Sequence, residues 1–151
     1  MDKTEMTAYC GLYCGECAFH EGTIPDLARD LRKELRKARF DKIAEVIPFK
    51  EFENYQEAYE VMGAMVKLRC KGCKLGGRSK FCNIAKCAVK KGYEGCWECD
   101  EFADCGKMEF LAHVHGDGHI KNLRKIKRVG VDQWVKEGPL WYSAPKKKKK
   151  S

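Results

Sequence analysis

Ten cysteines are the residues of this 151-residue chain whose type and spacing could do chemistry. Three pairs have C-x-x-C spacing: Cys14/Cys17, Cys70/Cys73 and Cys96/Cys99. That spacing lets two sulfurs on one tight turn bind a single ion. A tetrahedral zinc ion then takes its other two ligands from a second turn of the same kind. Three such pairs in one chain therefore predict metal binding through thiolates.

The assignment of ligands to ions stays open at the level of sequence. One compact set has the spacing C-x2-C-x8-C-x4-C and comprises Cys70, Cys73, Cys82 and Cys87. A second site would then combine two knuckles distant in sequence, Cys14, Cys17, Cys96 and Cys99. We favour this partition, in which Cys10 and Cys105 are spare thiols, alternative ligands or bridging ligands. About two zinc ions in mainly structural four-cysteine sites follow from it.

Other cysteine chemistries were weighed against zinc. An iron–sulfur cluster is the principal alternative, because four thiolates hold a cluster as well as they hold zinc, and the protein would then carry electrons. Disulfides are disfavoured because no secretory signal is visible. The Cys10-x3-Cys14-x2-Cys17 spacing is that of radical-SAM enzymes. We interpret it as coincidental, since the chain lacks the length and the alternating strands of their barrel.

Histidines offer a second donor set. His113, His115 and His119 follow one another as His-x-His-x3-His, and neutral imidazole is a good zinc ligand. One alternative is therefore a zinc enzyme that uses these three residues around an open coordination position. The competing interpretation is a polar turn between two helices. Whether the chain is an enzyme is left open.

The basic balance of the chain says little about its partners. The formal charge is +8, but residues 146–150 are all lysine and supply five of those charges. Lys71, Lys74, Arg78, Lys80 and Lys86 surround the central cysteines, in a pattern that would suit phosphate groups. Nucleic-acid binding is thus a hypothesis that we do not favour over an unidentified protein partner. No apolar run is long enough to span a membrane, so a cytoplasmic protein is expected.

The elements that position these residues are expected to be helical. We predict a helix from an N-cap at Thr23, with an apolar stripe continuing to Pro48, and a second helix over 51–68. Further helices are predicted over 84–91 with Asn83 as N-cap, over 105–113, between Asp117 and Gly130, and from Asp132. Strand signals are weak throughout.

The predicted fold class is therefore mainly α. We expect a small metal-stabilised domain of several helices packed on irregular cysteine (zinc) knuckles. It should occupy residues 1–144 as a single cysteine-rich metal-binding domain, followed by a disordered lysine tail over 145–151.

The cysteine motifs also carry a family resemblance. The run from Tyr9 to Cys17 reads Tyr-Cys-Gly-Leu-Tyr-Cys-Gly-Glu-Cys, and it is followed by Cys70-Lys71-Gly72-Cys73, Cys82-x4-Cys87 and Cys96-Trp97-Glu98-Cys99. This order resembles a cysteine-rich prokaryotic family of unknown function that opens with Tyr-Cys-Gly-Leu-x-Cys-Gly-x-Cys. The resemblance implies a small cytoplasmic protein, presumed to bind zinc, with no agreed activity. Together with the cysteine spacing it favours a zinc-binding protein that acts as a binding or adaptor module.

Overall fold

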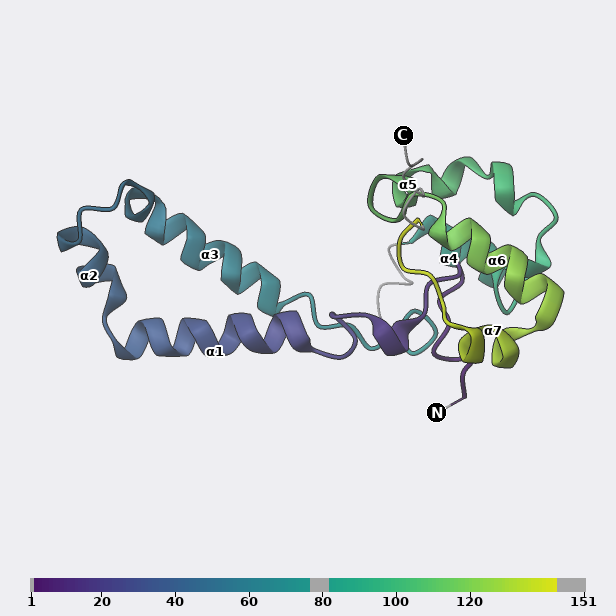
Figure 1. The fold of residues 1–151 in the computed structure, drawn as a ribbon, viewed down its shortest axis with the longest axis horizontal. Coiled ribbons are helices and arrows are strands. Elements are labelled where there is room, and N and C mark those ends of the chain that lie inside the picture. Colours follow the sequence, from purple (N-terminus) through teal and green to yellow (C-terminus); the bar gives the residue numbers. More distant parts are fainter. Residues whose placement is uncertain (1, 77–81, 144–151) are drawn as a thin grey trace, which may run out of the picture. The chain divides into compact units, whose positions relative to one another are not determined.

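The computed structural model describes residues 2–76 and 82–143, and its ribbon is drawn in Figure 1. Internal contacts divide the chain into two compact units. We call Cys17–Cys70 the hairpin unit, and Met1–Glu16 together with Lys71–Ser151 the cysteine unit. The sequence predicted one domain over 1–144, and each unit is described in its own right below. The predicted lysine tail over 145–151 lies outside the described residues.

The hairpin unit consists of α1 (Thr23–Lys37), α2 (Phe40–Val46), a short 3-10 helix η2 (Lys50–Asn54) and α3 (Tyr55–Val66). Thr23 is not the N-cap that the sequence suggested. The cap is Gly22, whose positive φ of 84° starts the helix without any side-chain hydrogen bond. The predicted continuous stripe is broken at Arg39, which adopts the left-handed region with φ 52° between α1 and α2.

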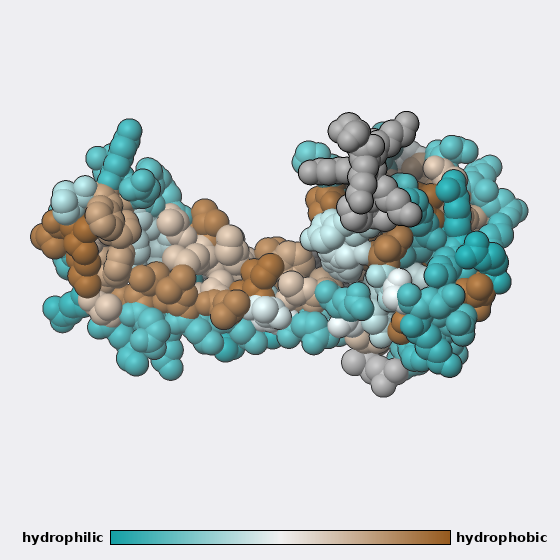
Figure 2. All heavy atoms as spheres, viewed as in Figure 1, coloured by the Kyte–Doolittle hydropathy of each residue, from teal (hydrophilic) through white to brown (hydrophobic). Residues whose placement is uncertain are grey.

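Along η2 and α3 the partly buried side chains are those that step by three and four along the predicted helix over 51–68: Phe52, Tyr55, Tyr59, Met62 and Val66. The α3 face is therefore confirmed, whereas α1 packs through a face that its apolar stripe does not predict. The Arg32 guanidinium lies 4.2 Å from the centre of the Tyr59 ring, and Arg36 Nη1 donates a 2.8 Å hydrogen bond to Tyr59 Oη. Leu27 and Leu31, two members of the predicted apolar stripe, are 65% and 50% exposed. Figure 2 shows hydrophobic side chains along the visible face of this unit. Long cationic side chains over a tyrosine ring therefore take the place of a leucine seam.

The cysteine unit carries the remaining elements. They are the 3-10 helices η1 (Cys14–Glu16), η4 (Cys96–Glu98), η5 (Phe102–Asp104) and η6 (Gly106–Met108), and the helices α4 (Asn83–Lys91), α5 (Glu109–His115), α6 (Gly118–Val129) and α7 (Val131–Glu137). The predicted ends at Gly92 and Gly130 and the cap at Asp117 are confirmed. Asn83 is the first residue of α4, and Cys82 occupies the N-cap position instead. The helix expected over 105–113 runs from Glu109 to His115, because η6 occupies its first turn.

The core of the cysteine unit forms where α6 and α7 pack over the 3-10 turns. Its members are Ile84, Cys96, Trp97, Phe102, Met108, Leu111, Leu123, Ile126 and Trp134. Across residues 2–76 and 82–143, β structure is limited to one isolated antiparallel bridge between Thr7 and Tyr13. The prediction of a mainly α fold is thus confirmed for the part of the chain described.

None of the helices in the described residues has the length and apolar character needed to cross a membrane.

Candidate metal centre

Four cysteines of the cysteine unit line a single cavity of about 90 Å³. They are Cys87, Cys96, Cys99 and Cys105, and all four carry free thiols. Cys87 lies on α4, Cys96 is the first residue of η4, Cys99 directly follows η4, and Cys105 directly precedes η6. Ile84, Phe102 and Met108 supply apolar wall around these sulfurs. The helix and the two turns thus bring together thiols that span 19 positions of sequence, from 87 to 105.

This grouping differs from the partition that we favoured from spacing. The sequence placed Cys82 and Cys87 in one site. Positions five residues apart on a helix, however, point in directions that differ by about 140° around its axis. Cys82 caps α4, whereas Cys87 lies on its body and faces the η4 turn. Cys105, for which the sequence predicts a spare thiol, an alternative ligand or a bridging ligand, lines the same cavity as the Cys96/Cys99 pair.

The surroundings of Cys96 in this cavity change the acidity of its thiol. Burial, together with the charges of the neighbouring Cys99, Cys105, Cys87 and Cys82, raises the pKa of Cys96 to about 12. On the rim, the nearby Cys87 and Cys99 raise the pKa of Lys91. Lys91 follows Cys87 by one helical turn and lines the same cavity. The Lys91 ammonium group therefore lies beside these thiols and would stabilise their deprotonated, thiolate form. Sequence inspection missed this lysine, although its i+4 spacing from Cys87 was visible.

The possible metal donors of the described residues lie apart from one another. No group of three or more His, Cys, Asp or Glu side chains stands in a geometry that holds a metal ion there. The four thiols share one cavity without meeting at one coordination point. The chemistry of the set, four free thiols with a neighbouring cation, still fits a soft divalent metal, provided that side chains rotate towards it.

A second set of thiols surrounds Cys10. Burial raises the pKa of Cys10 well above its ordinary value, and the charges of Cys73, Cys82 and Cys96 act in the same direction. The chain is held in place here because the Cys96 amide donates a 2.9 Å hydrogen bond to the Tyr9 carbonyl. Cys14 is buried in η1 of the same unit. Cys17 and Cys70 are the first and last residues of the hairpin unit.

Lys74 is half-buried in the cysteine unit, whereas its neighbours in the sequence suggested an exposed position. Its Nζ donates a 2.9 Å hydrogen bond to the Thr4 carbonyl and lies 5.2 Å and 5.0 Å from the centres of the Tyr9 and Trp97 rings. Burial lowers the pKa of Lys74. The sequence grouped this lysine with surface cations facing phosphates. The structure shows it half-buried between two aromatic rings, where it ties the N-terminal segment to η4. Of the other cations in that group, Arg78 and Lys80 lie outside the described residues.

The three histidines do not form one donor group in the described residues. His113 is exposed on α5, whereas His115 and His119 are buried. His115 Nδ1 lies 2.7 Å from the Trp141 carbonyl, which gives this ring a structural partner. His119 Nδ1 is buried without a hydrogen-bond partner, and desolvation, together with the charge of His115, lowers its pKa.

The fold and the cavity define a mainly helical, cysteine-rich protein whose conspicuous side chains are thiols. The family model described as "Protein of unknown function (DUF3795)" matches residues 6–110, which is more than half of the chain. The protein therefore belongs to this family. All ten cysteines fall inside the matched segment. No curated protein and no solved structure matches the chain.

Proposed function

We propose that this protein is a zinc-binding module whose metal sites are mainly structural. The observation that carries the proposal is the shared cavity of Cys87, Cys96, Cys99 and Cys105. Four thiolates are the donor set of structural zinc sites, and these four come from one helix and two turns of the same unit. A bound ion would hold α4, η4 and the start of η6 together.

The surroundings of the cavity support a structural rather than a catalytic ion. Cys96 belongs to the same hydrophobic cluster as Trp97, Phe102 and Met108, so an ion there would lie against the core. A zinc ion with four thiolates carries a net charge of −2, and Lys91 beside Cys87 and Cys99 partly compensates it. The thiols in this cavity are sufficient to fill all four tetrahedral positions, which leaves none for a substrate.

A second ion is part of the proposal. Cys73 and Cys82 are near enough to Cys10 for their charges to raise its pKa, and Cys14 lies in the same unit. These thiols are the donors that we assign to the second ion. With two ions, the metals would contribute much of the folding free energy of a unit with so small a core.

A role as a binding or adaptor module is consistent with the surface of the hairpin unit. Its helices leave apolar side chains in contact with solvent at helical spacing, Ile24, Leu27 and Leu31 on α1 and Val61 and Met65 on α3, and Leu68 in the turn after α3 is exposed as well. Apolar side chains gathered in this way are typical of surfaces that bind other proteins. We therefore propose a protein partner and a cytoplasmic location.

The test compares two variants of the same cavity. Replacing a donor, Cys99→Ser, should lower the zinc content by about one ion per chain and destabilise the cysteine unit. Lys107→Ala changes a side chain that lines the cavity but has no metal-donor role, and it should keep the full zinc content. Equal zinc content in Cys99→Ser and the unmodified chain would contradict the proposed ligand set.

A further inference from the structure

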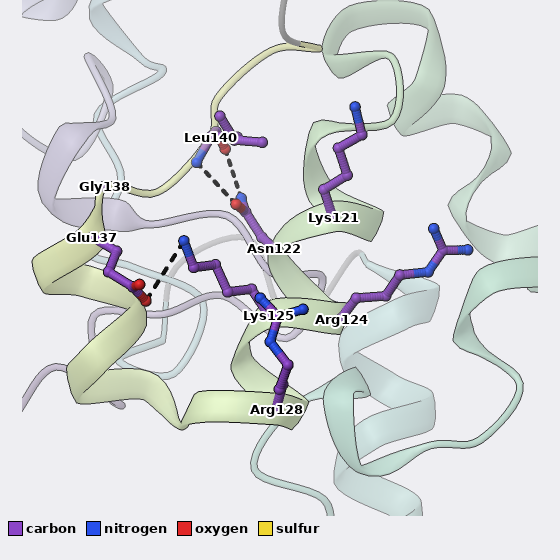
Figure 3. Close-up of a pocket in the computed structure, with 8 residues that line it drawn as sticks. All are labelled: Lys121, Asn122, Arg124, Lys125, Arg128, Glu137, Gly138 and Leu140. Carbon is purple, nitrogen blue, oxygen red and sulfur yellow. Dashed lines mark hydrogen bonds and ion pairs between the residues drawn. The ribbon is translucent and has the colours of Figure 1, made fainter.

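A second cavity of the cysteine unit is lined by cations rather than thiols. It measures about 450 Å³ and lies along α6, with the end of α7 and the following segment as its other wall (Figure 3). Lys121, Arg124, Lys125 and Arg128 line it from α6. This volume falls in the range of roughly 300–1,000 Å³ that is usual for small-ligand sites. The cavity lies beyond residue 110, where the family match ends.

The four cations form one face of α6. Their positions follow the spacing i, i+3, i+4, i+7, which puts them on one side of a helix over a length of about 10 Å. The opposite side of α6 is buried and carries His119, Leu123 and Ile126. The cationic face is therefore fixed by the packing of the helix against the core.

The far wall of the cavity is also fixed. Asn122 is 2% exposed, its Nδ2 donates to the Leu140 carbonyl at 2.6 Å, and its Oδ1 accepts from the Leu140 amide at 2.9 Å. Figure 3 shows these two bonds holding the segment after α7 against α6. The cavity thus has two anchored walls.

The charges of this face are only partly compensated. Lys121 pairs with Asp117 at 3.2 Å, and Lys125 pairs with Glu137 at 3.5 Å across the cavity. Among the described residues, neither Arg124 nor Arg128 has a recorded ion pair or hydrogen bond. Two guanidinium groups four residues apart on a helix repel each other. A bound anion would remove that repulsion.

We propose that this cavity binds the phosphate groups of a polyphosphate ligand, with Arg124 and Arg128 as its principal contacts. The planar guanidinium group offers paired donors that match phosphate oxygens, and two such groups one turn apart suit neighbouring phosphates. None of the described residues that line the cavity is aromatic, so none of them stacks on a base. Recognition therefore rests on the phosphates. Their source is either a free polyphosphate or a nucleic-acid backbone, and the experiment separates these two.

The experiment titrates tripolyphosphate into the full zinc-loaded chain by calorimetry. It compares Arg124→Gln/Arg128→Gln with the charge-matched control Lys33→Gln/Lys37→Gln on α1, whose side chains are exposed and have the same i, i+4 spacing. The arginine variant should weaken binding about tenfold or more, because it removes charge-assisted hydrogen bonds. The control should bind like the unmodified chain. Removal of zinc by tripolyphosphate would give the same heat in all three proteins and so cannot imitate this difference.

Fluorescence anisotropy of a labelled single-stranded oligonucleotide then distinguishes the two sources. Parallel loss of oligonucleotide and tripolyphosphate binding in the arginine variant would place a nucleic-acid backbone in the cavity. Loss of tripolyphosphate binding alone would assign the cavity to free polyphosphates. The proposal is overturned if the unmodified chain does not bind tripolyphosphate or if both variants bind it equally. It is also overturned if citrate binds as tightly with the same dependence on the two arginines.

Discussion

Asn122 Nδ2 donates a 2.8 Å hydrogen bond to the carbonyl of Gly11, a residue 111 positions earlier in the chain. The same side chain accepts a 3.1 Å bond from Trp134 Nε1 and holds Leu140 through two further bonds. One buried amide therefore connects the N-terminal cysteine segment, α6, α7 and the segment after α7. Because every one of these groups is polar and largely shielded from water, the contacts depend on one another.

We predict that Asn122→Ala destabilises the cysteine unit by about 3 kcal/mol, because it leaves several buried polar groups without partners. Urea unfolding of the zinc-saturated protein, followed by tryptophan fluorescence, measures this change. Gln133→Ala, at an exposed position of the neighbouring helix, serves as the control and should change the unfolding free energy by less than about 0.5 kcal/mol. Equal stabilities of the two variants would show that the Asn122 network contributes nothing.

Three glycines of the cysteine unit provide a graded test of backbone geometry. Gly11 has φ +90°, and a Cβ there would lie 2.8 Å from Leu123 Cγ and 2.9 Å from the His119 carbonyl oxygen. Gly130 has φ +84° with open space, and Gly106 has open space without a positive φ. Substitution by alanine should therefore cost most at Gly11, about 1 kcal/mol at Gly130, and nothing measurable at Gly106. Unfolding free energies of the three variants check this order, and a Gly11→Ala variant as stable as Gly106→Ala would refute it.

A glycine should instead stabilise the hairpin unit at Arg39. This residue is held at φ 52° between α1 and α2, a conformation that costs a non-glycine residue about 1 kcal/mol. Arg39→Gly should slow amide exchange in peptides covering residues 23–47. Lys33→Gly, within α1, should accelerate it, because glycine disfavours a helix interior by about 1 kcal/mol. Faster exchange in Arg39→Gly would contradict the assigned backbone strain.

Removal of metal should affect the two units differently. The proposed ligands Cys87, Cys96, Cys99 and Cys105 all lie in the cysteine unit, whereas α1 and α3 contain no cysteine. Chelation under reducing conditions should accelerate hydrogen exchange over 83–108 much more than over 23–66. Uniform acceleration over both segments, or none in either, would contradict the placement of the ions.

Much of the helical framework was predictable from local signals. Gly92 and Gly130 end helices where the sequence places them, and Asp117 caps α6 as expected. On α3 the packed face follows the apolar spacing, and Tyr59 is one of its partly buried members. The α1 side was not predictable, because Arg32 and Arg36 pack on Tyr59 while Leu27 and Leu31 face solvent. Apolar periodicity identifies the face that prefers burial. It does not reveal that cationic side chains with long apolar stems have taken the interface.

The candidate sites were likewise predictable only in part. The cysteines and their C-x-x-C pairs are visible in the sequence. That Cys87 and Cys105 line the same cavity is not, because it depends on the rotation of α4 and on the turns around η4 and η5. The cationic face of α6 was present as spacing alone, at positions 121, 124, 125 and 128. Its significance required the structure, because only the segment held by Asn122 makes that face one wall of a cavity.

The most direct test of the account is the metal content of the unmodified chain purified without oxygen, measured together with its visible absorption spectrum. We predict about two zinc ions per chain and no visible band, as expected of structural thiolate sites. Stoichiometric iron with a brown band near about 400 nm, as thiolate-held clusters give, would contradict the zinc proposal and indicate an electron-transfer protein.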